Sequence, residues 1–312
     1  MSKKVAVVGT GLVGRAWSIV FARGGFDVCL WDPVEGAAAA ARENVERMLP
    51  ELEGFDLLRQ QSSEAVLSRI RVGTSLRDAL DGACHMQESG PERVEIKRDI
   101  YRELVTVADA DTVLASSTSG IPASAFTEDL PTRERCLVAH PINPPHIVPA
   151  VEMIPAPWTD DAVLNRTSEL MRSVGQVPIR LSREIEGFLV NRLQGALLAE
   201  AFRLVEDGVC GVDDVDAAIA DGLGLRWSFM GPFETIDLNS PTGVRGYCDM
   251  LGPLYYSLAK DQADPRPWGE AIVAKIEGQR RERLDETEIA KRQAWRDKRL
   301  AQLVRHKTAV AD

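Results

Sequence analysis

Short apolar runs alternate with longer helical stretches from residue 5 to residue 181. Short runs, most of them apolar and many of those rich in β-branched residues, predict strands at 5–8, 26–30, 70–72, 85–88, 112–115, 136–139, 151–154 and 177–181. Between them, apolar positions that recur with a period of about 3.6 residues predict helices, for example over 15–23, 92–108 and 160–174. Strands that alternate with helices in this way form a parallel sheet with helices on its faces.

The pattern changes near residue 186. A long helix is predicted from Phe188 to Val205, no convincing strand follows it, and further helices are expected at 213–222 and, highly charged and solvated, at 277–305. We therefore expect an α/β domain at residues 1–186 and an all-α domain at residues 187–312. Within the first domain, Pro50 is expected to begin an acidic connection between two helices, because proline disrupts a helix interior.

A glycine-rich turn, Gly9-Thr10-Gly11-Leu12-Val13-Gly14, follows the first predicted strand. Gly9 permits the tight turn, Gly11 lets backbone N–H groups approach a pyrophosphate, and Gly14 allows the helix to pack closely on the sheet. The phosphates then lie at the positive end of the helix. The pattern predicts a Rossmann-type dinucleotide-binding domain; the alternative is a glycine turn that binds nothing.

The second predicted strand ends at Asp32, which would accept hydrogen bonds from the adenosine ribose hydroxyls. Residues 33–36 contain no Arg or Lys that could hold a 2′-phosphate. NAD is therefore the expected cofactor rather than NADP.

Composition and charge narrow the class of protein. The 312 residues include 45% hydrophobic and 27% charged residues, which is enough for two domains with a sizeable core. The net charge of −10 argues against binding to nucleic acid or to an anionic membrane surface. Five cysteines without CxxC spacing indicate neither a metal site nor a disulfide framework. With no room for a signal peptide and no membrane span, a cytoplasmic protein is expected.

His140 lies at the end of a predicted strand, where open α/β sheets place their ligands. A proline-rich loop leads from it to Glu152, the carboxylate of an otherwise apolar strand. If the loop folds back, Glu152 would fix the tautomer of the imidazole, raise its basicity and stabilise the imidazolium. Such a base could take a hydroxyl proton while a hydride leaves to nicotinamide. The alternatives are a structural histidine and a Glu152 that points outward from an edge strand.

Two further polar positions lie near these candidates. The hydroxyl cluster Ser117-Thr118-Ser119 follows a strand and could donate hydrogen bonds to the reacting oxygen or to the nicotinamide amide, although such clusters commonly form turns. Asn191, near the start of the long helix, carries an amide that needs hydrogen-bond partners. Both positions are candidates for holding the substrate.

Several motifs, in one order along nearly the whole chain, resemble the 3-hydroxyacyl-CoA dehydrogenase superfamily. The residues that carry the resemblance are Gly9–Gly14, Asp32, Pro91-Glu92, Ser117–Ser119, His140–Pro144, Glu152, Gly187–Arg192 and Met230–Glu234. The resemblance implies a catalytic pair of His140 and Glu152, with Ser119 and Asn191 at the substrate oxygen. It implies cofactor contacts at Glu92, Lys97, Ser119 and Asn143, with Asn143 also near the substrate, and a homodimer formed by the helical domain.

Within the superfamily, the chain is more similar to the lambda-crystallin or L-gulonate 3-dehydrogenase branch. The similarity rests on residues 87–92, 139–145, 221–232 and 292–297. The segment 50–61 is short and acidic, whereas CoA-using members would present lysines in this region. The segment therefore offers little electrostatic attraction for the phosphates of CoA. Arg226 occupies a position at which the CoA-using members typically have a small or apolar residue. Its guanidinium is suited to pair with a free carboxylate; the alternative is an arginine that simply lies on the surface.

The expected activity is thus the NAD-dependent oxidation of the 3-hydroxyl of a small free acid, with L-gulonate as the leading substrate. One alternative is a carnitine dehydrogenase, in which Trp227 would hold a trimethylammonium group by cation–π attraction. Others are a 3-hydroxyacyl-CoA dehydrogenase and a non-catalytic, crystallin-like protein that binds NAD.

Overall fold

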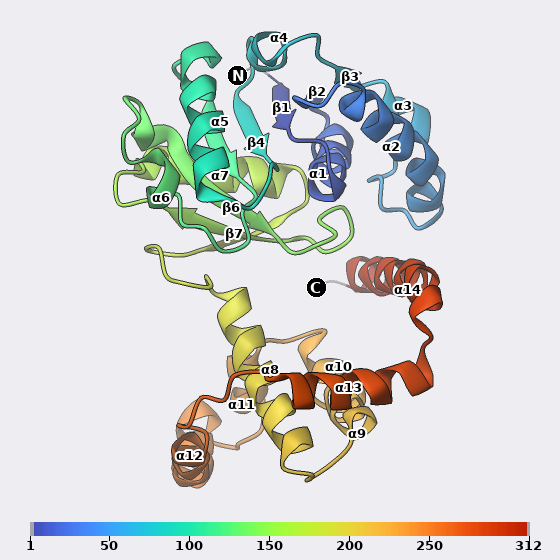
Figure 1. The fold of residues 1–312 in the computed structure, drawn as a ribbon, viewed down its shortest axis with the longest axis vertical. Helices are drawn as coiled ribbons and strands as arrows, with labels where there is room; N and C mark the ends of the chain where they lie inside the picture. Colours follow the sequence, from blue (N-terminus) through green and yellow to red (C-terminus); the bar gives the residue numbers. More distant parts are fainter. Residues whose placement is uncertain (1–2, 311–312) are drawn as a thin grey trace. The chain divides into compact units, whose positions relative to one another are not determined.

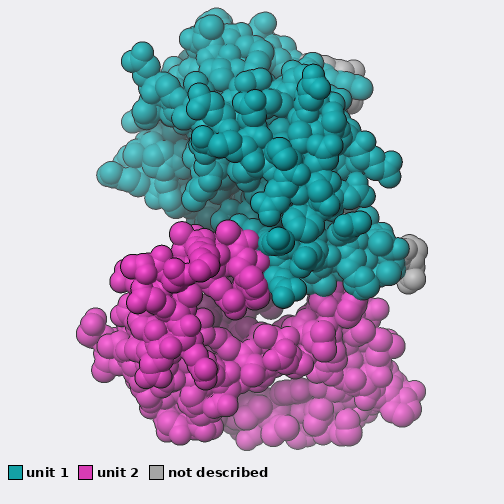
Figure 2. Space-filling view, turned by 90° about the vertical axis from the view of Figure 1, so that its right-hand side faces the viewer, with its two compact units in different colours: residues 1–191, 296–312 teal, residues 192–295 magenta. Residues whose placement is uncertain are grey.

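The computed structural model describes residues 3–310, which form two compact units. The first unit contains the chain up to Asn191 together with the segment from Arg296 onward, and the second contains Arg192–Trp295 (Figure 2). The sequence placed the division between residues 186 and 187. The C-terminal segment joins the first unit because Ala301, only 2% exposed, packs into its core.

The first unit is built on one eight-stranded sheet with the order β3-β2-β1-β4-β5-β6-β7-β8 (Figure 1). The strands are β1 (Lys4–Val8), β2 (Asp27–Trp31), β3 (Ile70–Val72), β4 (His85–Glu88), β5 (Val113–Ser116), β6 (Cys136–Pro141), β7 (Ala150–Pro155) and β8 (Val177–Arg180). All neighbouring strands are parallel except β6 and β7. The strand order reverses between β1 and β4, the place where such sheets bind nucleotides.

Helices cover both faces of this sheet, as the alternating pattern predicted. One apolar cluster joins the sheet to α1 (Leu12–Arg23), α2 (Ala37–Gly54), α3 (Ser63–Leu67) and α7 (Asp161–Ser173). A second cluster lies on the other face, with α4 (Leu76–Leu80), α5 (Val94–Val107) and α6 (Ser124–Thr127). The predicted fold class, a Rossmann-type domain followed by a helical domain, is confirmed.

The region around Pro50 differs from the prediction. Helix α2 continues through Pro50 to Gly54, and the turn comes later, at Asp56 with a φ of 58°. Leu49 and Leu52, on either side of the proline, are both buried in the core. Their packing outweighs the hydrogen bond that proline removes from the helix.

The second unit consists of helices. It contains most of α8 (Val190–Glu206), then α9 (Val212–Ala217), a π-helical segment (Ala218–Leu223), α10 (Gly224–Trp227), α11 (Pro232–Leu238), α12 (Gly243–Asp261) and α13 (Glu270–Arg283). The single terminal helix predicted at 277–305 is divided into α13 and α14 (Ile289–Ala309). The division falls at Asp285, whose carboxylate accepts a hydrogen bond from the backbone N–H of Thr287. Across residues 3–310, no helix is long and apolar enough to cross a membrane.

Candidate active site

His140 and Glu152 face each other on the antiparallel strands β6 and β7, where they are register partners. The Nδ1 atom of His140 lies 2.7 Å from Oε2 of Glu152. Glu152 is completely buried, and β7 lies between β6 and β8, so the glutamate does not point outward from an edge strand. The loop between the two strands therefore folds back and brings the carboxylate to the imidazole.

The second oxygen of Glu152 receives two backbone hydrogen bonds. The N–H groups of Leu189 and Val190 donate to Oε1 over 2.7 and 2.9 Å. Burial by itself raises the pKa of Glu152, but the hydrogen bonds from His140, Val190 and Leu189 outweigh it and bring the pKa below its ordinary value. An ionised carboxylate only accepts hydrogen bonds, so Nδ1 of His140 carries a proton and donates it to Glu152, and in the neutral imidazole Nε2 is the nitrogen with the lone pair.

The depressed pKa of Glu152 predicts a loss of stability in acid. Because the unfolded chain binds this proton at a higher pH than the folded protein, the stabilisation is complete above about pH 5 and is lost as the pH falls through the folded pKa. The Glu152→Gln variant lacks this contribution. The difference in unfolding free energy between wild type and variant, measured by urea denaturation, should shrink between about pH 7 and about pH 3.

The exposed Glu103→Gln substitution is the matched control, and its difference from wild type should not vary with pH in this way. A pH-independent difference for Glu152→Gln would contradict the assignment of Glu152 as a buried carboxylate stabilised by its hydrogen bonds.

The loop after β5 is held from two sides. The Nδ2 atom of Asn191 donates to the carbonyl oxygen of Ser119 over 2.7 Å. Oε1 of Glu92 accepts hydrogen bonds from the Thr118 hydroxyl at 2.5 Å, from the Ser119 N–H at 2.9 Å and from the Gly120 N–H at 3.2 Å. Asn191 and Glu92 therefore fix the path of the loop, and the side chain of Ser119 remains exposed.

Lys97, which is expected from the sequence on the cofactor side, lies in a buried ion pair. It is 1% exposed, and its ammonium nitrogen lies 2.9 Å from each carboxylate oxygen of the fully buried Glu88. Glu92 is 3.8 Å away on the other side. Glu88 was not among the predicted site residues, and the polar sequence of its strand, His85-Met86-Gln87-Glu88, gave no sign that its carboxylate would be buried.

Ser117 takes part in a second group of contacts that was not predicted. Its hydroxyl oxygen accepts hydrogen bonds from Nε1 of Trp17 at 3.0 Å and from Nε2 of Gln87 at 2.7 Å, and it lies 3.0 Å from the hydroxyl of Ser89. The hydroxyl of Ser117 is thus engaged within the protein, in contrast to that of Ser119.

The turn between β1 and α1 fits a dinucleotide. Gly9 has a φ of +87°, and a Cβ there would lie 2.7 Å from the carbonyl carbon of Ser89, so only glycine fits. Gly11 caps α1 without a side-chain hydrogen bond, and no acidic residue occupies the first turn. A Cβ on Gly14 would overlap the carbonyl oxygen of Gly9. The helix N–H groups beside the exposed Leu12 can therefore receive an anion.

Asp32 retains acceptor capacity for a ribose. Its Oδ2 accepts hydrogen bonds from the N–H and the hydroxyl of Thr10, at 2.7 and 2.9 Å, and its Oδ1 accepts one from the N–H of Val34 at 3.0 Å. Each carboxylate oxygen has two lone pairs, so these contacts orient Asp32 without excluding a ribose hydroxyl from Oδ1.

The remaining predicted residues occupy separate places. Val13, in the first turn of α1, is partly buried and packs against the core, and Asn143 is exposed in the loop between β6 and β7. Arg226 and Trp227 are both exposed on α10, in the second unit, whereas the residues around His140 belong to the first.

A dinucleotide-binding turn on a doubly wound sheet, with an imidazole and its buried carboxylate at a strand end, is the architecture of an NAD-dependent dehydrogenase that oxidises a CH–OH group. The chain belongs to the 3-hydroxyacyl-CoA dehydrogenase family. Residues 4–185 match the family's NAD binding domain, and residues 187–281 match its C-terminal domain.

Individual relatives point to several members of this family. A lambda-crystallin homolog from Bos taurus is 43% identical over 306 residues, covering 96% of this chain and 95% of the relative. An L-carnitine dehydrogenase from Streptomyces griseus is 35% identical over 308 residues, covering 97% of this chain and 89% of the relative. The solved structure of an NAD-dependent dehydrogenase of 5-formyl-3-hydroxy-2-methylpyridine 4-carboxylic acid is similar with a TM-score of 0.84, 27% identity and 98% coverage of both chains.

Proposed function

We propose that the protein oxidises the 3-hydroxyl group of a small free 3-hydroxy acid, such as L-gulonate, to the 3-keto acid, and that the reaction is reversible. His140 is the general base in oxidation and the general acid in ketone reduction. The observation that carries this role is the 2.7 Å contact between His140 and the buried Glu152. NAD, when bound, supplies the acceptor for the hydride.

The residues around His140 have complementary roles. Nε2 takes the hydroxyl proton, and the carboxylate of Glu152 stabilises the imidazolium that results. The exposed hydroxyl of Ser119 holds the substrate oxygen, and Asn191 positions Ser119 through its 2.7 Å hydrogen bond to the serine carbonyl. In this proposal, the base that takes the proton and the hydroxyl that holds the substrate oxygen act on the same group of the substrate.

The cofactor is held by the residues of the first turn. The backbone of Gly9, Gly11 and Leu12, with the close packing of Val13 and Gly14, receives the pyrophosphate, and Asp32 binds the adenosine ribose. Glu92, Ser119 and Asn143 contribute on the nicotinamide side. Lys97 acts through its ion pairs with Glu88 and Glu92, because its own ammonium group is buried.

The choice of a free acid over a CoA thioester rests on the charge of residues 50–61. Glu51, Glu53 and Asp56 are exposed on this segment. Its one cation, Arg59, donates a hydrogen bond to the carbonyl of Ser173. A surface of this sign repels the phosphates of CoA.

Arg226 and Trp227 suggest how such a substrate is recognised. The guanidinium of Arg226 is exposed and has no hydrogen-bond or ion-pair partner among residues 3–310, so it can pair with the substrate carboxylate. Trp227 is 41% exposed, which favours L-carnitine as the second candidate, with its trimethylammonium group against the indole.

The formation of NADH with L-gulonate, L-carnitine, L-3-hydroxybutyrate and a 3-hydroxyacyl-CoA tests the proposal. Activity is expected on a free acid, and Arg226→Met should lower kcat/KM for that acid by about 10- to 100-fold, since a charge-assisted contact is lost. Arg245→Met, which replaces another exposed arginine of the same unit, should have little effect.

Different results would select an alternative. Activity on the thioester alone would overturn the free-acid assignment. Selective loss of carnitine turnover in Trp227→Ala would favour the carnitine dehydrogenase. Binding of NAD without turnover of any of these substrates would favour the crystallin-like, non-catalytic protein.

A homodimer is proposed because the second unit has a small core of its own. Its buried apolar cluster consists of Val205, Val212 and Ile272. Many large apolar side chains of the unit are exposed, among them Leu193, Leu197, Phe229, Phe233, Met250, Leu254 and Tyr256. A patch of this kind normally marks an interface between proteins.

Sedimentation equilibrium at micromolar concentration is expected to give twice the mass of one chain. Phe233→Glu, at a position that is 79% exposed, should shift the protein towards the monomer by placing a charge in the interface. A monomeric wild-type protein would contradict the proposal.

A further inference from the structure

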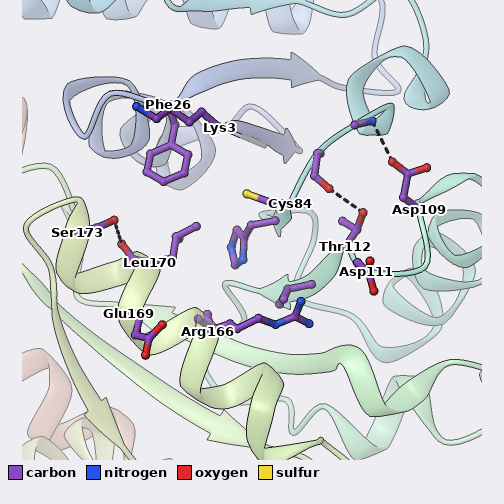
Figure 3. Close-up of a pocket in the computed structure, with 15 residues that line it drawn as sticks. Lys3, Phe26, Cys84, Asp109, Asp111, Thr112, Arg166, Glu169, Leu170 and Ser173 are labelled. Carbon is purple, nitrogen blue, oxygen red and sulfur yellow. Dashed lines mark hydrogen bonds between the residues drawn. The ribbon is translucent and has the colours of Figure 1, made fainter. Parts of the chain in front are cut away.

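Figure 3 shows a cavity of the first unit, which has a volume of about 840 Å³. It lies at the amino-terminal edge of the sheet, because the first residues of its parallel strands line it, whereas His140 and Ser119 lie at or beyond the carboxyl ends of β6 and β5. The first residues of β4 and β5 line it, and α7 forms one wall. Apolar groups make up much of its surface, from Phe26, Cys84, Val113 and Leu170. The cavity is thus distinct from the candidate active site and large enough for a small organic molecule.

His85 lines the cavity and carries an unsatisfied ring nitrogen. The residue is 1% exposed, and its Nε2 lies 3.0 Å from Oε1 of Gln87. Its Nδ1 is buried and has no hydrogen-bond partner among residues 3–310. Burial brings the pKa of His85 down to about 4, so the ring is neutral near neutral pH.

The contacts of Gln87 determine which nitrogen of His85 bears the hydrogen. Nε2 of Gln87 donates to the hydroxyl oxygen of Ser117 and to the carbonyl oxygen of Ala139, so Oε1 of Gln87 is an acceptor. Nε2 of His85 must therefore donate to it. Nδ1 is left as an acceptor that requires an O–H or N–H donor, and a buried acceptor without one is costly.

We propose that this cavity is a regulatory site for a small uncharged molecule with a planar apolar body and one O–H or N–H group that donates to Nδ1 of His85. The planar body would contact Phe26 and Leu170.

An uncharged ligand is favoured by the distribution of charge around the cavity. The charged residues that line it are of both signs and exposed, namely Lys3, Asp109, Asp111, Arg166 and Glu169. Figure 3 shows Glu169, a residue of α7, and Asp111 on opposite sides of the cavity. The buried residues of the cavity carry no fixed charge to compensate an ionic ligand for its lost hydration.

The hydrogen bonds of His85 provide a route to the candidate active site. A donor at Nδ1 polarises the ring and strengthens the bond from its Nε2 to Gln87, and hydrogen bonds in series reinforce one another. Gln87 in turn contacts Ser117, which precedes Ser119, and the carbonyl of Ala139, which precedes His140. Occupancy of the cavity is therefore expected to change the affinity for NAD.

Binding of indole and of benzofuran to the full-length protein tests the proposal. The two probes have the same bicyclic shape, but only indole has an N–H donor. Calorimetry should show indole binding at least about fivefold more tightly than benzofuran, and the nitrogen-15 resonance of Nδ1 should shift with indole alone. Saturating indole should change the Kd for NAD by about twofold or more, which benzofuran should not.

Two variants assign the binding to this cavity. His85→Phe should remove the preference for indole, and Leu170→Phe, which fills the cavity without touching Gln87, should weaken both probes. Equal affinity for the two probes, binding of indole that persists in Leu170→Phe, or an unchanged affinity for NAD would each overturn the proposal. Because these measurements use no substrate, their outcome is independent of the proposed reaction.

Discussion

Replacing His140 with alanine is expected to lower kcat by about two to four orders of magnitude, the usual effect of removing a positioned general base. The imidazole is 6% exposed and is held by a carboxylate that is completely buried, so its position is fixed by the fold. Steady-state formation of NADH from the free acid measures the effect. Because His140 lies at the end of β6, away from the turn between β1 and α1, the Kd for NAD should change little.

The exposed His306 provides the matched control, since His306→Ala removes a histidine on α14. That variant should keep the activity of the wild type. If His140→Ala retained activity within about a factor of two, a group other than this imidazole would have to take the hydroxyl proton.

Replacing Lys97 with methionine is expected to lower the free energy of unfolding by about 3 kcal/mol or more, because it leaves the carboxylate of Glu88 buried without its cation. Lys97 and Glu88 are 1% and 0% exposed. Within residues 3–310, the carboxylate of Glu88 would retain the hydrogen bonds from the Ser116 hydroxyl and the Gly90 N–H, at 2.5 and 2.6 Å. Urea denaturation followed by circular dichroism measures the change.

The double variant Lys97→Met with Glu88→Gln is the control, because it removes both charges. It should recover much of the lost stability, since an uncharged pair avoids the cost of an unpaired buried ion. A loss below about 1 kcal/mol in the single variant would mean that Glu88 is not dependent on Lys97. A lower affinity for NAD in a stable Lys97→Arg variant would instead favour a direct role at the cofactor.

The strands and the helices between them were predictable from the sequence because they depend on local patterns, whereas the strand order and the antiparallel pairing of β6 with β7 were not predicted. Most of the strands from β1 to β8 coincide with a short apolar run, and the turn at Gly9 needs a residue that tolerates a φ of +87°. The contact between His140 and Glu152 was expected on the condition that the loop between them folds back, and the structure shows that it does. These features follow from residues that are near one another along the chain.

Contacts between distant segments were less predictable. The polar sequence of the terminal region indicated a solvated helix, yet Ala301, Leu300 and Val304 of α14 pack against the core of the first unit. Pro50 indicated the end of a helix, yet buried Leu49 and Leu52 hold that helix together. In both cases, the burial of a few apolar side chains outweighs the local tendency of the sequence.

The sequence by itself determined the alternation of strands and helices, the cofactor turn and the position of His140 at a strand end, because periodicity and backbone freedom are local properties. Only the tertiary structure decided the partners of the buried polar groups. Glu152 accepts hydrogen bonds from the N–H groups of Leu189 and Val190, and Lys97 forms a buried ion pair with Glu88. A buried charge or acceptor must find its partner in space, and the three-dimensional packing of the chain determines which partner is within reach.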